Sequence, residues 1–152
     1  METPIVYDKA KYHFESIEEN QLPEIQAYVH TGLYLGWLVD NNLLDSEFIN
    51  DFGQDIPKFK NKEITGSQLL FLWDGALIDD MLNEEGNKFS QYYFDFDHGQ
   101  YITDYETHMT QNLQSIFHVE DTWENHETVK DFVNKRYSTW KNTESKSWWK
   151  IW

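Results

Sequence analysis

The sequence predicts a mainly α-helical, compact single-domain protein around one central apolar helix, with at most a short β element. Apolar residues recur at three- and four-residue spacing in several segments, which is the helical period. The chain has 152 residues, the length of one ordinary domain, and no repeat or Pro/Gly-rich linker divides it. Its 10 Phe, 9 Tyr and 7 Trp can build a dense core, unlike the aromatic-poor composition of disordered acidic chains.

The central helix is expected from about residue 24 to residue 44. Pro23 can occupy its first turn, where the missing backbone N–H costs nothing. Apolar side chains surround this segment instead of forming one stripe, which is typical of a helix buried on all sides. Gly32 and Gly36, four residues apart, would let a neighbouring helix approach closely.

Two shorter helices are expected next. Asp45 or Ser46 has the side chain of a helix N-cap, and Gly53 has the backbone freedom of a helix end. Thr65 can cap a third helix that ends at residues 74–75. Residues 77–105 predict two further helices broken around residues 97–99, although YYFDF at 92–96 is equally compatible with a short strand.

The last predicted helix is amphipathic and reaches about Asn142. Asp121 and Glu124 have capping-box spacing, and apolar residues follow at helical period from Val129 to Trp140. A basic, Trp-rich tail follows at about 143–152. It is expected to pack against the domain, and the alternative is an exposed end that makes a homodimer.

The formal charge of −15 is unevenly distributed. Residues 1–127 carry six lysines against 25 acids, a charge of −19, whereas residues 128–152 carry a charge of +4. Such a negative surface repels nucleic acid and anionic membranes and attracts basic proteins. The alternative is that the charge serves only solubility.

Membrane insertion and secretion are not expected. No stretch reaches the roughly 18 apolar residues of a spanning helix, and the first residues lack the features of a signal peptide. The absence of cysteine excludes disulfides and thiolate metal sites. The expected compartment is the cytoplasm.

The sequence shows few signs of catalysis. It contains no Gly-rich phosphate loop and no GxSxG motif. We therefore expect neither an enzyme nor a cofactor, and no bound metal. The alternative is a metal-dependent or general acid/base enzyme that uses His13, His30, His118 and Glu120, since imidazole and carboxylate groups are metal ligands.

Several stretches resemble a known family. They are YDKAKYHFE at 7–15, AYVHTGLYLGWLVDNNLL at 27–44, LNEEGNKF at 82–89 and FHVEDTWENHETVKDFVNKRYSTWK at 117–141. They are similar to uncharacterised acidic bacterial proteins, classed as a domain of unknown function, that carry WHY-like and HVEDTWEN-like motifs. The resemblance implies no established activity, but proteins of this character are frequent among toxin-immunity proteins.

The leading hypothesis is an immunity or antitoxin-like protein that neutralises a cognate basic toxin, with a nuclease as the favoured class. Carboxylates in the phosphate positions of a basic cleft would give complementarity, and aromatic anchors would slow dissociation. The chain departs from the family pattern near residues 93–101. The partner-binding residues predicted on these grounds are Asp79, Asp80, Glu84, Glu85, Tyr92, Tyr93, Asp95, Asp97 and Tyr101. A third reading is an adaptor or structural subunit.

Overall fold

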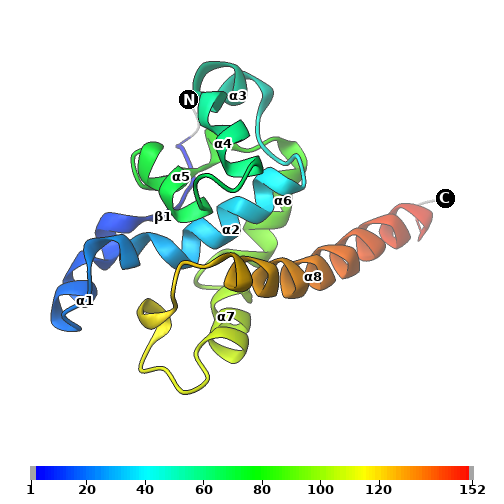
Figure 1. The fold of residues 1–152 in the computed structure, drawn as a ribbon. Helices are drawn as coiled ribbons and strands as arrows, with labels where there is room; N and C mark the ends of the chain where they lie inside the picture. Colours follow the sequence, from blue (N-terminus) through cyan, green and yellow to red (C-terminus); the bar gives the residue numbers. More distant parts are fainter. Residues whose placement is uncertain (1–2, 151–152) are drawn as a thin grey trace.

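The computed structural model describes the backbone of residues 3–150 and the side chains of residues 3–144 (Figure 1). It confirms the mainly α class. The helices are α1 (Phe14–Glu19), α2 (Val29–Asp40), α3 (Ser46–Phe52), α4 (Ile56–Lys60), α5 (Gly66–Leu72), α6 (Glu84–Tyr93), α7 (Tyr101–Met109) and α8 (Trp123–Lys150). The strands are β1 (Val6–Lys9) and β2 (Ala76–Ile78). None of the described helices combines the length and apolarity needed to cross a membrane.

Helix α2 is the centre of the fold, as the sequence predicts. Every residue from 29 to 39 is buried, and α3 to α5 lie on one side of it while α7 lies on the other (Figure 1). The segment begins as a 3-10 turn at Glu24–Tyr28 and ends at Asp40, four residues before the predicted end. The chain leaves the helix through Asn42, whose φ of 58° is left-handed.

Both predicted caps of the following helices are confirmed. The Asp45 side chain accepts a hydrogen bond from the Phe48 N–H at the start of α3. Thr65 and Gln68 form a reciprocal capping box at the start of α5. Helix α4 is an addition to the prediction, with a proline in its first turn.

The β element is formed by residues that the sequence did not indicate. β1 pairs antiparallel with β2, so that Val6 lies opposite Ile78 and Lys9 opposite Ala76. The alternative of a strand at 92–96 is wrong. Residues 92 and 93 end α6, and the Phe94 N–H donates to the Ser90 carbonyl oxygen in the same helical pattern. The Phe94 ring is stacked on Tyr34 in the core, so this segment packs as the end of a helix.

Helix α8 packs on α2 and then projects from the body of the protein (Figure 1). The predicted cap by Asp121 is wrong: the Thr122 hydroxyl accepts from the Asn125 N–H, while Asp121 accepts from Thr65. The helix also passes its predicted end at Asn142 and runs to Lys150. The side chains of 145–150 and residues 151–152, on which self-association through the tail depends, lie outside the described residues.

Candidate functional site

An open groove of about 580 Å³ lies beside α3 and contains two of the predicted binding residues, Asp79 and Asp80. We call it the α3 groove. Its lining consists of acidic, aromatic and amide side chains with one leucine: Asp45, Glu47, Phe48, Asp51, Phe52, Asp79, Asp80, Leu82 and Asn87. None of these residues carries a positive charge.

Aromatic side chains that pack on one another form the apolar part of the α3 groove. The ring centroids of Phe48 and Phe52 are 5.3 Å apart, and Phe48 packs edge-to-face on Trp73 at 4.9 Å. The Trp73 indole N–H donates to the Phe52 carbonyl oxygen at 3.1 Å, which holds the end of α3. Phe52 is nevertheless 53% exposed, so a large ring faces solvent among carboxylates.

Most carboxylates of the α3 groove have no cationic neighbour. Among the described side chains, no lysine or arginine forms an ion pair with Glu47, Asp51, Asp79 or Asp80. Asp79 Oδ1 is also shielded from solvent without a hydrogen-bond partner in the described part of the chain. Glu47, Asp51 and Asp80 are exposed and are therefore available to a cation from another molecule.

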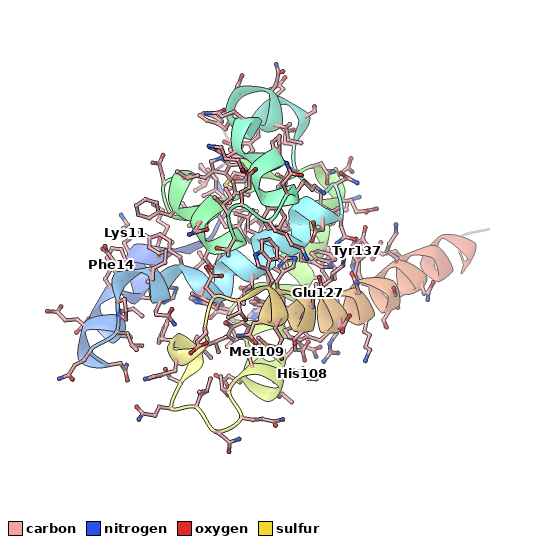
Figure 2. All side chains as sticks on the ribbon, in the orientation of Figure 1. Lys11, Phe14, His108, Met109, Glu127 and Tyr137 are labelled. Carbon is pink, nitrogen blue, oxygen red and sulfur yellow. The ribbon has the colours of Figure 1, made fainter. Side chains whose placement is uncertain are left out.

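The predicted acids on α6 are already engaged. Glu84 pairs with Lys88 at 3.1 Å on the surface of the same helix. Glu85 lies 3.7 Å from the Lys141 ammonium group and accepts a hydrogen bond from Tyr137. Tyr137 projects from α8, as its label in Figure 2 shows. Tyr92, on α6, is 58% exposed. Glu85 therefore holds α6 to α8, and Tyr92 is the freer of these groups.

Two of the predicted binding residues belong to the core. Tyr93 is 1% exposed and donates its hydroxyl hydrogen to Asp104, which also binds Arg136. Tyr101 is fully buried and donates to the His30 carbonyl oxygen at 2.6 Å. Their rings fill the space between α2, α6 and α7, which removes them from any binding surface.

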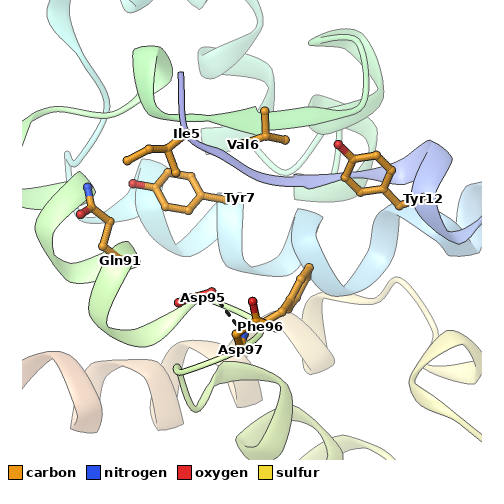
Figure 3. Close-up of a pocket in the computed structure, with 8 residues that line it drawn as sticks. All are labelled: Ile5, Val6, Tyr7, Tyr12, Gln91, Asp95, Phe96 and Asp97. Carbon is orange, nitrogen blue, oxygen red and sulfur yellow. Dashed lines mark hydrogen bonds between the residues drawn. The ribbon is translucent and has the colours of Figure 1, made fainter. Parts of the chain in front are cut away.

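Asp95 and Asp97 line a second groove, between β1 and the chain that follows α6 (Figure 3). This β1 groove has a volume of about 530 Å³ and includes the exposed rings of Tyr12 and Phe96. Asp95 accepts a hydrogen bond from the Asp97 N–H at 3.2 Å, which shapes the turn. The residues predicted for one interface are thus divided between two grooves, the surface of α6 and the core.

A buried cluster of Asp8, His13 and His30 lies behind the β1 groove. Asp8 comes from β1, His13 from the 3-10 turn that follows it, and His30 from the first turn of α2. Asp8 Oδ1 is 2.7 Å from His13 Nε2, and Asp8 Oδ2 is 3.3 Å from His30 Nε2. Asp8 and His30 are each 1% exposed, whereas the His13 side chain is 18% exposed.

Burial and charge act in opposite directions in this cluster. Burial by itself would raise the pKa of Asp8, but contacts with His13 and His30 outweigh it and hold the pKa of Asp8 below its ordinary value. Burial lowers the pKa of His30, and Asp8 offsets that effect only in part. The arrangement favours an ionised carboxylate beside a neutral buried imidazole.

Aromatic rings enclose the cluster. The Phe117 centroid is 5.5 Å from the ring of His13 and 5.7 Å from that of His30, and the Phe96 centroid is 6.4 Å from both. Phe96 also lines the β1 groove, so its ring lies between the cluster and that surface. Thr31 donates its hydroxyl hydrogen to Asp8 Oδ2 at 2.5 Å and orients the carboxylate.

The structure brings together only two of the four residues of the enzyme alternative. His13 and His30 meet with a centroid distance of 4.7 Å, but His118 is bonded to Ser115 and Glu120 is exposed. The missing third partner is Asp8. A carboxylate directly after the apolar residues 5–7, and five residues before a histidine, is the signal that could have indicated it.

A second buried histidine has a different environment. His126 Nε2 is 3.0 Å from Asp40 Oδ2, and the same carboxylate lies 3.7 Å from the Lys60 ammonium group. Burial raises the pKa of Asp40, but His126 and Lys60 together lower it below its ordinary value. The pair links α8 to the end of α2 and is a structural contact.

Comparison with known proteins gives one match. The model of a domain of unknown function, DUF7832, matches residues 6–119. This range contains Asp8, His13, His30 and the lining of the α3 groove, and it ends three residues into the HVEDTWEN-containing stretch. No curated protein and no solved structure matches the chain.

Proposed function

Starting from the fact that the chain belongs to the DUF7832 family, we propose that it binds a basic protein partner through the α3 groove. The role proposed for this binding is immunity: the protein neutralises a cognate toxin domain, with a nuclease as the favoured class. The carrying observation is that unpaired carboxylates surround an exposed aromatic cluster in one groove.

The charges of the α3 groove suit a cationic cleft. A nuclease presents lysine and arginine side chains to phosphate groups, and carboxylates held at similar positions replace those phosphates. Glu47, Asp51 and Asp80 offer such groups from two different elements. Because none has a cationic neighbour among the described side chains, association does not first have to break an internal ion pair.

The aromatic side chains of the α3 groove support slow dissociation. Large rings that become fully desolvated at the centre of an interface contribute most of the binding energy. Phe52 is exposed beside the carboxylates, and contacts with Phe48 and Trp73 fix the surface on which it lies. A rigid ring loses little conformational entropy on binding, which favours affinity.

The test begins with recovery of partners from the native cell, followed by kinetics with the strongest purified partner. We expect a basic protein whose toxicity on expression is relieved by this chain. The double charge reversal Asp51→Lys/Asp80→Lys should raise the dissociation rate at least about tenfold, because both substitutions put like charges against the partner. It should also abolish the relief of toxicity.

A matched control separates the interface from net charge. Glu18→Lys/Glu19→Lys makes the same charge change on exposed positions of α1, far from α3 (Figure 1), and should leave the dissociation rate unchanged. Asp95→Lys/Asp97→Lys probes the β1 groove in the same way. A larger effect there than at Asp51 and Asp80, or recovery of only acidic partners, would contradict binding at the α3 groove.

A further inference from the structure

We propose that Asp8, His13 and His30 form a binding site for one divalent transition-metal ion of the Zn²⁺ type. The site is independent of partner binding at the α3 groove. Each residue offers one ligand atom, and these atoms all lie within 4.8 Å of one another. Two imidazoles and one carboxylate form a donor set that proteins use for Zn²⁺ and Fe²⁺.

The distances in the cluster are close to those that such an ion requires. With metal–ligand bonds of about 2.0–2.1 Å, neighbouring ligands of a tetrahedral site lie about 3.3 Å apart. The contact between Asp8 Oδ2 and His30 Nε2 has a length of 3.3 Å, and the one between Asp8 Oδ1 and His13 Nε2 is 2.7 Å. These two contacts involve different oxygens of the Asp8 carboxylate, so binding of one ion requires the three ligand atoms, which lie within 4.8 Å of one another, to draw together by up to about 1.5 Å. His13, the partly exposed member, is the ligand expected to move.

An independent observation comes from the hydrogen bonding of His30. Its side chain is 1% exposed, yet neither ring nitrogen has a hydrogen-bond partner in the described part of the chain. Buried polar atoms in proteins nearly always have one. The nearest acceptor, Asp8 Oδ2, already receives the Thr31 hydroxyl hydrogen at 2.5 Å. A metal bond to His30 Nε2 would give that nitrogen the partner it lacks.

The surroundings also have the features of a metal site. Thr31 orients the carboxylate from outside the ligand set, as second-shell groups do around protein-bound metals. Phe96 and Phe117 pack beside both imidazoles and restrict their contact with water; for His30 this exclusion is nearly complete. The candidate group contains three ligands in the described part of the chain, and a three-ligand site leaves one coordination position for water or a small ligand.

The His126–Asp40 pair shows why the proposal is restricted to the first cluster. There the carboxylate is shared with the Lys60 ammonium group, which repels a metal cation, and no third ligand joins the pair within the described residues. Among the described side chains, the hydrogen bond of His126 Nε2 is to Asp40. The His126–Asp40 pair is therefore a simple histidine–carboxylate contact, whereas Asp8, His13 and His30 are three ligands that converge on one point.

The experiment is calorimetric titration of tag-free, chelator-treated full-length protein with Zn²⁺, with Mg²⁺ as a hard-ion comparison. We expect one Zn²⁺ ion per chain, no comparable binding of Mg²⁺, and a higher melting temperature with Zn²⁺. Nitrogen-detected NMR of the histidine rings should show shifts for His13 and His30. The variants His13→Ala and His30→Ala should weaken Zn²⁺ binding at least about tenfold.

Controls keep the outcome decisive. His118→Ala removes a half-buried loop histidine outside the cluster and should bind Zn²⁺ as the wild type does. His13 is partly exposed, so His13→Ala remains a test even if His30→Ala does not fold. Absence of Zn²⁺ binding, or Zn²⁺ affinity that is unchanged in a folded His13→Ala variant, would overturn the site.

Discussion

At the scale of single residues, threonine hydroxyl groups position buried or half-buried carboxylates in this protein. Thr31, next to the buried His30 in the sequence, donates its hydroxyl hydrogen to Asp8 and orients that carboxylate. The Thr65 hydroxyl accepts the Gln68 N–H as a helix cap and also donates to Asp121 Oδ2 at 2.6 Å. Asp121 is half-buried, and burial raises its pKa because the hydrogen bonds to its carboxylate offset desolvation only in part. Thr65 therefore stabilises a helix and a poorly solvated carboxylate together.

Removal of the Thr65 hydroxyl should thus cost more than removal of a simple cap. Loss of an N-cap side chain costs about 1 kcal/mol, and an unsatisfied buried acceptor adds about 1 kcal/mol or more. Thr65→Ala should lower the free energy of unfolding by about 2 kcal/mol, measured by urea denaturation. Asp45→Ala, which removes the cap of α3, should cost about 1 kcal/mol. Equal losses in the two variants would show that the contact with Asp121 contributes nothing.

At the scale of elements, the fold depends on the close approach of α2 and α5. Gly32 and Gly66 face one another, and a Cβ atom on Gly32 would overlap the Ser67 backbone. A Cβ on Gly66 would overlap the Gly32 carbonyl oxygen. Gly36 lies against the side-chain rings of His126 and Phe59. Small residues on α2 therefore allow α5 and α8 to pack tightly on it, which brings Thr65 and Asp121 together.

The crossing of α2 and α5 predicts a large effect of one methyl group. Gly32→Ala should destabilise the protein by about 1–3 kcal/mol, because backbone atoms of Ser67 cannot move away as a flexible side chain can. The control is Gly53→Ala at the end of α3, where the new Cβ meets only side-chain atoms of Ile49 and Ile56. Denaturation curves should show a clearly smaller loss for Gly53→Ala. An unchanged midpoint for Gly32→Ala would contradict the close packing.

At the scale of the whole molecule, charge is divided between an acidic body and a basic last helix. Residues 1–127 carry a charge of −19, and the excess of positive charge begins within α8, which projects from the body (Figure 1). Part of that positive charge is used internally: Arg136 binds Asp104, and Lys141 lies beside Glu85. The net field around the body is therefore negative and attracts a basic partner at long range.

This field predicts how salt affects the proposed partner. The charges of the body attract a basic partner at long range, but physiological salt screens this attraction beyond about 8 Å. The association rate should therefore fall steeply as the salt concentration rises. The dissociation rate should change much less, since contacts in the formed complex are desolvated. Stopped-flow or surface-based kinetics at several salt concentrations measure both rates. An association rate that does not change with salt concentration would contradict this attraction and would favour the alternative that the charge serves only solubility.

The sequence alone determined the helical class, the buried central helix and two of the helix caps. These features depend on local spacing and on the chemistry of adjacent residues, as with Thr65 and Gln68 or the apolar run of α2. Local spacing also predicted that Gly32 lies at a close helix contact, which the position of Ser67 bears out.

Only the tertiary structure decided which side chains meet. Asp8, His13 and His30 come from three elements, and β1, which carries Asp8, pairs with β2 nearly 70 residues later in the sequence. Tyr93 and Tyr101 are of a residue type that is common in binding surfaces, but they lie in the core. Phe48 and Phe52 belong to a predicted helix, and the structure places them in the α3 groove. Periodicity specifies the direction of a side chain around its own helix, but the neighbour it meets depends on long-range packing.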